Sequence, residues 1–344
     1  MQITKSQKRT KQLIAFFGAS VTAQSNGYVE CFARLNPEVA VRKHGFGGMH
    51  LCDAGMCFLD QVLENKPNYC YIDWFSTGYR STGDETMEYI NTLIARLTLI
   101  QCKIVFLFLP YREDDKRDFY LHCKTILSNK NIHYLAIDEL VEPKDINTIL
   151  RDSIHTTDKG SEKYAEYISN DYHAVKLELT SQVERTRFMN IKTYAVEKCF
   201  SDELVISGDC FIIGFLLTIG NHSGLIKVKS EAFEITINTW DRWCHYPRPH
   251  FNLPMQVAGT TRLTILQDAF DTSSCKELSD FTRFEKKLII HKIYYIGETL
   301  KVNNLERGKR IYTLAIRTKQ AWGRLKQLAR KIARLTQQQP TSRK

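Results

Sequence analysis

A serine that could act as a nucleophile lies near the start of the chain. Residues 13–17 are apolar and predict a buried strand, and Gly18, Ala19 and Ser20 follow directly. In open α/β sheets ligands bind at the carboxyl ends of the strands, where Ser20 would lie. The helix expected to begin there would favour developing negative charge. Gly-x-Ser after a strand is common, so Ser20 needs partners to act as a nucleophile.

A pair of glycines follows the second predicted strand. Gly47 and Gly48 lie between Phe46 and Met49. Glycines that open a helix let main-chain N–H groups approach an oxyanion. The segment is therefore a candidate oxyanion site or an ordinary tight turn, and its sequence alone does not choose between them.

An acid and an imidazole are spaced to act together. Asp152 precedes His155 by three residues, on a segment that enters a predicted helix over 157–170. The carboxylate could orient the imidazole, and the imidazole could take the proton of a serine. A single histidine is more often structural or merely exposed, so this inference depends on the other two segments.

Alternating strands and helices supply the framework for these residues. Strands are predicted over 13–17, 39–43, 69–75, 103–109 and 133–137, and helices over 49–64, 84–100, 112–128 and 157–170. Strict alternation implies a parallel sheet covered on both faces. Thr156 or Thr157 is expected to cap the last helix.

The pattern changes from about residue 190. Short β-rich runs occupy 194–197, 203–206, 211–219, 224–228, 232–239, 255–257 and 261–266, and 282–305 could add one or two strands. Turn-type residues at 207–209, 220–224 and 247–249 separate them. These features predict an antiparallel β-sandwich.

The two patterns divide the chain of 344 residues, which is long enough for two domains. We expect an α/β domain over 1–172, a linker over 173–189 and a β-sandwich-like domain over 190–305. A basic amphipathic helix and a polar tail would fill 306–344.

Together, the three segments resemble the SGNH (GDSL-type) hydrolase family over roughly residues 10–170. The family's first block, Gly-Asp-Ser, here reads Gly-Ala-Ser and ends at Ser20; its second-block glycine maps to Gly48, and its last block, Asp-x-x-His, to Asp152 and His155. The resemblance implies a flavodoxin-like, five-stranded parallel sheet and acyl-ester chemistry without a metal. It implies that Ser20 attacks, His155 is the base and Asp152 fixes the imidazole. The N–H groups of Gly48 and Ser20 would hold the oxyanion.

One block departs from the family pattern. The third block normally reads Gly-x-Asn-Asp, and its asparagine would align with Gly78. Losing one such donor costs on the order of 10²–10³ in rate. A main-chain N–H around 76–78 or the Thr77 hydroxyl would substitute, or catalysis would be weak or altered. Asp73 is a further candidate functional residue, or a polar residue that ends the strand.

Other side chains could contact a substrate. His50 follows the glycines, while Arg80 and Arg112 follow the third and fourth strands, where an anionic group would be met. Ordinary turn or surface roles are the alternative. Trp240 and Trp243, with an acid and an arginine between them, could stack on a sugar. Core or interdomain packing is the alternative for them.

The net positive charge of the chain comes from its last segment. Residues 307–344 hold twelve Lys or Arg and no Asp or Glu, so this segment accounts for all of the net charge of +10. Over 307–335 the apolar residues recur with helical period, which fits an anionic membrane surface or an acidic protein partner. Packing on the protein's own body is the alternative. A nucleic-acid partner is not expected, because the rest of the chain is not basic.

The composition indicates a globular protein that is not exported. Hydrophobic residues make up 43% of the chain, enough for a sizeable core, which excludes disorder as the main state. No segment provides the roughly 20 apolar residues of a membrane-spanning helix, and no secretory signal is predicted. Ten scattered cysteines without a CxxC pair favour free thiols in the cytoplasm. No metal site is predicted.

These features converge on a cytoplasmic serine esterase, peripheral on the inner membrane face if the tail binds lipid. The resemblance implies an O-acyl substrate, and we expect it to be an O-acetyl group of a carbohydrate in bacterial capsule or surface-polysaccharide biosynthesis. One alternative is a carbohydrate O-acetyltransferase with the same triad, which would use acetyl-CoA; otherwise no cofactor is expected. The other is a non-catalytic glycan-binding or scaffold protein.

Overall fold

The computed structural model describes residues 11–77, 83–112, 117–180, 184–239, 247–267 and 285–304. They belong to one compact unit, Met1–Asn304. Four predicted site residues (Gly78, Arg80, Trp240 and Trp243) lie outside the described residues, as does the predicted helix over 307–335. Within the described ranges, no helix is both long enough and apolar enough to cross a bilayer.

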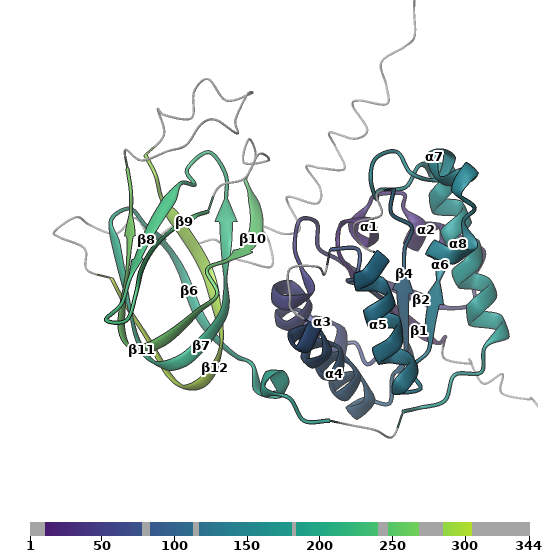
Figure 1. The fold of residues 1–344 in the computed structure, drawn as a ribbon, viewed down its shortest axis with the longest axis horizontal. Coiled ribbons are helices and arrows are strands. Elements are labelled where there is room, and N and C mark those ends of the chain that lie inside the picture. Colours follow the sequence, from purple (N-terminus) through teal and green to yellow (C-terminus); the bar gives the residue numbers. More distant parts are fainter. Residues whose placement is uncertain are drawn as a thin grey trace, which may run out of the picture. The chain divides into compact units, whose positions relative to one another are not determined.

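A five-stranded parallel sheet forms the first half of the unit (Figure 1). Its strands are β1 (Leu13–Gly18), β2 (Ala40–Gly45), β3 (Tyr69–Asp73), β4 (Lys103–Phe108) and β5 (Tyr134–Ala136). They are ordered β2-β1-β3-β4-β5, and every neighbouring pair is parallel. This order confirms the predicted flavodoxin-like sheet.

The strands are connected by helices. These are α1 (Ser20–Ala23), α2 (Tyr28–Leu35), α3 (Leu59–Leu63), α4 (Gly83–Leu99), α5 (Arg117–Asn129), α6 (Ile137–Leu140), α7 (Ile146–Ile149) and α8 (Asp158–Ala174), with single turns η1 (Leu51–Gly55), η3 (Pro143–Asp145) and η4 (Arg187–Asn190). The helix expected to begin at Ser20 is present as the short α1, whereas the sequence analysis missed α2, α6 and α7. Of these, α6 and α7 have only four residues each, too few to show helical periodicity.

The single helix predicted over 49–64 is wrong. The chain instead forms the π-helical turn η1, and α3 begins only at Leu59. The break falls at Phe58, whose backbone (φ −100°, ψ 1°) leaves helical geometry. Its ring stacks on Phe46 with centroids 4.5 Å apart, so packing overrides the helical pattern at this point.

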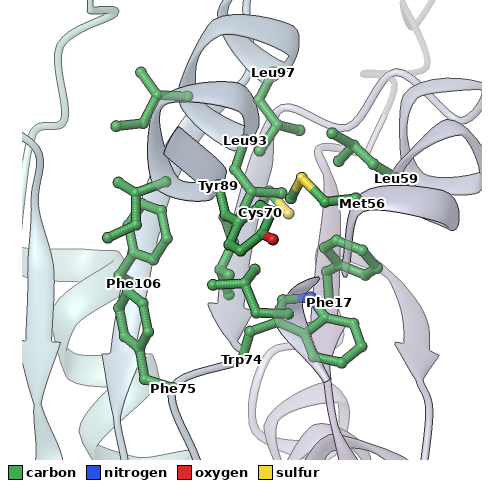
Figure 2. Packing of buried hydrophobic residues seen from close by; sticks show 14 of the residues in the cluster. Phe17, Met56, Leu59, Cys70, Trp74, Phe75, Tyr89, Leu93, Leu97 and Phe106 are labelled. Carbon is green, nitrogen blue, oxygen red and sulfur yellow. The ribbon is translucent and has the colours of Figure 1, made fainter. Parts of the chain in front are cut away.

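Alternate residues of β1 face two separate cores. Ile14 and Phe16 are buried with residues of α2 and α8. Ala15 and Phe17 are buried with residues of α3, α4 and α5. Figure 2 shows part of this second core, with Phe17 close to the indole of Trp74. A sheet buried on both faces explains why its strands read as continuous apolar runs.

The second half is all-β, as predicted. Its strands are β6 (Lys192–Phe200), β7 (Glu203–Ile219), β8 (Leu225–Lys229), β9 (Glu234–Asn238), β10 (Arg248–Asn252), β11 (Met255–Ile265) and β12 (Leu288–Asn304). All pair antiparallel in one sheet, ordered β6-β12-β7-β11-β8-β9, with β10 added along β7. The strands form one continuous sheet that curls around a core of its own (Figure 1).

Two turn predictions in this half are wrong. Residues 207–209 lie inside β7, because the neighbouring β12 shifts register between Gly297 and Thr299 and the strands bend there instead of ending. Arg248 and Pro249 are the first residues of β10, a strand that the sequence analysis missed. Pro249 is tolerated because β10 lies off the main order of the sheet, where a missing N–H costs little.

Aromatic side chains join the two halves of the unit. Phe58 meets Phe251 of β10 edge-on at 5.1 Å and Tyr294 of β12 at 6.3 Å between ring centroids. All three belong to the same buried cluster as Phe17 and Trp74. The antiparallel sheet is therefore packed on the layer that contains η1 and α3.

Close packing at the start of α8 gives a stability prediction. A Cβ on Gly160 would stand 2.1 Å from the main-chain oxygen of Ile149. We expect Gly160→Ala to lower the free energy of unfolding by about 1–3 kcal/mol, because the backbone at Ile149 must move. Urea denaturation measures the change. Lys159→Ala, at an exposed neighbouring position, is the control and should change it by less than about 0.5 kcal/mol. Equal stability of the two variants would contradict this prediction.

Candidate active site

Ser20 lies at the carboxyl edge of the parallel sheet, where β1 passes into α1. The N–H of Ala19 donates to the main-chain oxygen of Asp73 at the end of β3 (3.0 Å), and the N–H of Phe46 donates to that of Gly18 (2.9 Å). These bonds fix the turn between its two neighbouring strands. Ser20 follows directly as the first residue of α1 and is half-buried.

The structure brings Ser20, His155 and Asp152 together. The Oγ atom of Ser20 lies 2.9 Å from Nε2 of His155. On the other side of the ring, Nδ1 lies 2.9 Å from Oδ2 and 3.1 Å from Oδ1 of Asp152. An ionised carboxylate only accepts hydrogen bonds, so Nδ1 carries the proton. Nε2 is then the acceptor for the Ser20 hydroxyl.

The Asp152 carboxylate is held in its charged form. Burial alone would raise its pKa, but the pKa lies below its ordinary value because the carboxylate accepts several hydrogen bonds. Oδ1 accepts the N–H groups of Ile154 (3.0 Å) and His155 (2.8 Å), in addition to the imidazole. The spacing of three residues thus lets one carboxylate both shape the loop and orient the ring.

The loop that carries this pair, residues 150–157, is tied to the rest of the domain. Arg112 donates from its N–H to the main-chain oxygen of Ser153 (2.9 Å) and from its guanidinium to that of Leu150 (2.7 Å). The sequence analysis considered Arg112 for contact with an anionic substrate. The structure instead uses these donors to hold the loop.

A second tie connects the loop directly to the helix of Ser20. Gln24 donates to the main-chain oxygen of Thr156 (3.0 Å) and accepts from the Thr156 hydroxyl (3.2 Å). Thr157 caps α8 by accepting the N–H of Gly160 at 3.0 Å, as predicted for one of the two threonines. Sequence reasoning missed Gln24, because nothing in a lone glutamine indicates a partner 132 residues away.

The glycine turn, residues 45–50, lies beside Ser20. A Cβ built on Gly47 would be 4.0 Å from the Cβ of Ser20. Gly48 has φ of +72°, a left-handed conformation that favours glycine. Both glycines are exposed, so a ligand at Ser20 would meet the main chain of this turn. Main-chain N–H groups placed in this way could stabilise negative charge.

Thr77 and His50 brace the glycine turn. The Thr77 hydroxyl donates to the main-chain oxygens of Met49 (3.2 Å) and Trp74 (3.4 Å). Its own main-chain oxygen accepts from Nδ1 of His50 at 2.7 Å. The structure therefore directs the Thr77 proton at main-chain oxygens and not toward Ser20. Both residues therefore stabilise the glycine turn through these hydrogen bonds.

Asp73 lies at the end of β3, against the turn that carries Ser20, and is fully buried. Its Oδ2 accepts from the hydroxyl of Thr22 at 3.0 Å, and Thr22 in turn accepts from the hydroxyl of Tyr28 at 2.7 Å. Burial, followed by the nearby Asp73 charge, raises the pKa of Tyr28. Asp73 therefore anchors α1 to β3 and is not placed to touch a substrate.

Metal-binding side chains do not gather in the part of the chain that the structure describes. No group of three or more His, Cys, Asp or Glu residues there could hold a metal ion. At the described site, a hydroxyl, an imidazole and a carboxylate form a chain of hydrogen bonds. Such a chain can transfer the serine proton while the oxygen attacks an electrophile.

Comparison with known proteins establishes the fold. No family model matches the chain, and no curated protein matches its sequence. Among solved structures, a two-domain esterase (CEX) active on acetylated mannans, co-crystallised with mannopentaose, is similar with a TM-score of 0.61; a second structure of a two-domain esterase (CEX) active on acetylated mannans gives 0.58. Each is 12% identical, and the similarity covers 84% of this chain and 92% of the other. The predicted SGNH-like fold with a second β domain is confirmed.

The contacts of Asp152 predict its titration. Its pKa should lie below the ordinary value of 3.8, and His155→Ala should move it upward by removing the imidazole donor. ¹³C NMR of the aspartate carboxyl groups measures both values. Because the folded pKa is the lower one, the related stabilisation is present above the unfolded value and is lost as pH falls through the folded value. His173→Ala, farther along α8, is the control; an Asp152 midpoint that moves equally in both variants, or in neither, refutes the contact.

Proposed function

We propose that the protein is a serine esterase that removes O-acyl groups, chiefly O-acetyl groups, from a carbohydrate. The observation that carries this proposal is the 2.9 Å contact between Oγ of Ser20 and Nε2 of His155. Asp152 completes the chain of hydrogen bonds on the far side of the ring. A nucleophile, a base and an orienting acid in this arrangement are the requirements for acyl transfer through serine.

In the first half of the reaction, Oγ of Ser20 attacks the acyl carbon of the ester. The serine proton passes to Nε2 of His155, and the carbonyl π-electrons move to the oxygen, giving an oxyanion. The oxyanion then reforms the carbonyl and the bond to the sugar oxygen breaks. That oxygen takes the proton from Nε2 and leaves as an alcohol, so that Ser20 carries the acyl group.

In the second half, water replaces the alcohol. Nε2 of His155 takes a proton from the water as its oxygen attacks the acyl carbon. When the second oxyanion collapses, the bond to Oγ breaks and the proton returns to Ser20. The products are the carboxylic acid and the free enzyme. Asp152, held charged by its hydrogen bonds, stabilises the imidazolium in both halves.

The main chain is the proposed support for the oxyanion. The N–H groups of Ser20 and Gly48 are the candidates, since the glycine turn lies beside Ser20. Donors that are already in position stabilise charge without reorganisation at the moment of reaction. The mechanism needs no cofactor.

The proposed substrate class rests on the fold. The two-domain esterase with the same fold is active on acetylated mannans, and its similarity extends over both the parallel sheet and the β domain. An acetylated polysaccharide is therefore the first substrate to test. The further proposal of a role in surface-polysaccharide biosynthesis relies on the basic segment 307–335, which could keep the enzyme at an anionic membrane.

The transferase alternative shares every step up to the acyl-enzyme. It differs only in the second half, where a sugar hydroxyl replaces water and acetyl-CoA serves as the donor. The scaffold alternative has less support, because a protein without catalysis has no need for a mutually hydrogen-bonded Ser20, His155 and Asp152. Neither alternative has an observation of its own in the described site.

Hydrolysis of p-nitrophenyl acetate tests the proposed chemistry. We expect wild type to release p-nitrophenol and acetate, and Ser20→Ala and His155→Ala to lose about 10³-fold or more of kcat/KM. Ser128→Ala, an exposed serine on α5, is the matched control and should keep full activity.

Release of acetate from acetylated mannan, followed by ¹H NMR, tests the substrate class with the same variants. Acetate release that depends on Ser20 supports the proposal. Acetyl transfer to a glycan without acetate release would make the protein a transferase. Activity that is equal in wild type and Ser20→Ala would overturn the esterase.

A further inference from the structure

A cation from the antiparallel sheet reaches the glycine turn. Arg248 is the first residue of β10, and its Nη1 atom lies 3.2 Å from the position that a Cβ on Gly48 would occupy. The Cζ and Nη2 atoms lie 3.9 and 4.0 Å from the same point. The guanidinium thus fills the space beside Gly48 where another residue would have a side chain. It is half-buried, so its charge is partly shielded from water.

Packing near both residues fixes this approach. Phe251, on the same short strand as Arg248, meets Phe58 at 5.1 Å, and Phe58 stacks on Phe46 at 4.5 Å. Phe46 lies two residues before Gly48 in the glycine turn. The ladder between β10 and β7 holds the other side, pairing Arg248 with Ile219 and Phe251 with Leu216. The position of Arg248 is therefore set by a core and a sheet, not by a free loop.

The site lacks one side-chain hydrogen-bond donor that the family resemblance implies for the oxyanion. Gly78 stands where the family resemblance expects the oxyanion-hole asparagine, and glycine brings no side-chain donor. The Thr77 proton is directed at main-chain oxygens. A guanidinium offers five N–H donors, keeps its charge at every relevant pH and accepts nothing. Cationic side chains are among the groups that stabilise an oxyanion.

We propose that Arg248 is an oxyanion donor, so that the antiparallel β domain completes the active site of the parallel domain. The inference rests on the proposed esterase function. In the attack of Ser20 the developing oxyanion would lie between the N–H of Gly48 and the guanidinium of Arg248. The two domains are then a single catalytic unit, in which the second domain takes part in the chemical step.

A substrate without a sugar separates this role from carbohydrate binding. An oxyanion donor acts on every ester, because the oxyanion belongs to the acyl group. A residue that only binds sugar acts on the glycan ester alone. p-Nitrophenyl acetate carries the acyl group and no sugar, and it is therefore the substrate of choice.

The test compares Arg248→Met and Arg248→Lys with Arg262→Met on p-nitrophenyl acetate. Arg262 is the control, since it lies on β11 and pairs with Glu203 on the surface. We expect Arg248→Met to lower kcat by about 10²–10³-fold with little change in KM. Arg248→Lys should recover part of the loss, because it keeps the charge but not the fork of donors. Arg262→Met should match wild type.

Chemical rescue distinguishes a hydrogen-bond donor from a residue that only stabilises the fold. In Arg248→Ala, added methylguanidinium should raise kcat in a saturable way, and tetramethylammonium, which cannot donate a hydrogen bond, should not. If Arg248→Met does not fold, as judged by its thermal unfolding, the rescue and Arg248→Lys decide the question instead.

Different experimental results would overturn this inference and the proposed function. Full kcat in a folded Arg248→Met, or a loss confined to acetylated mannan, would overturn the oxyanion role while Ser20→Ala still abolishes activity. Equal activity of wild type and Ser20→Ala would instead remove the esterase itself. A loss of kcat on p-nitrophenyl acetate, with rescue by methylguanidinium, supports Arg248 as the donor.

Discussion

The hydrogen bond between Ser20 and His155 is the contact on which the rest of the site depends. It joins residues 135 positions apart, across 2.9 Å. Each partner is held by a separate part of the sheet edge. Ser20 is held by the turn after β1, which is hydrogen-bonded to the ends of β2 and β3, and His155 by Asp152, Arg112 and the cap of α8. The hydrogen bond from Gln24 to the main-chain oxygen of Thr156 connects these two parts. A small displacement of any of these supports would lengthen the hydrogen bond on which the proposed nucleophile depends.

Buried polar groups near the site act as supports for this geometry. Asp73, Thr22 and Tyr28 form a chain of hydrogen bonds below α1, where each polar atom would be costly without a partner. Aromatic rings support the site from the apolar core. Phe46 stacks on Phe58, and this contact holds the glycine turn in position. The same rings hold the antiparallel sheet in place. The packing that shapes the parallel domain thus also brings β10, and Arg248, to the glycine turn.

Local patterns predicted the parallel sheet and the three segments that meet at Ser20, because buried strands and motif spacing are visible within a few residues. Features that depend on tertiary contacts were predicted wrongly or were missed. The prolines at 247 and 249 indicate a turn, yet sheet pairing makes this segment the strand β10. Asp73 was a candidate for substrate binding, but its side chain is fully buried and accepts a hydrogen bond from Thr22. Gln24 and Arg248 carry no local signal, since their roles arise from residues far away in the chain.

The most direct test of the account is covalent labelling of the nucleophile. A fluorophosphonate reacts with an activated serine, and mass spectrometry of the intact protein and its peptides locates the adduct. The account predicts one adduct per chain, on Ser20, which disappears in Ser20→Ala and forms far more slowly in His155→Ala. An unlabelled wild-type protein, or an adduct on another serine, would contradict it.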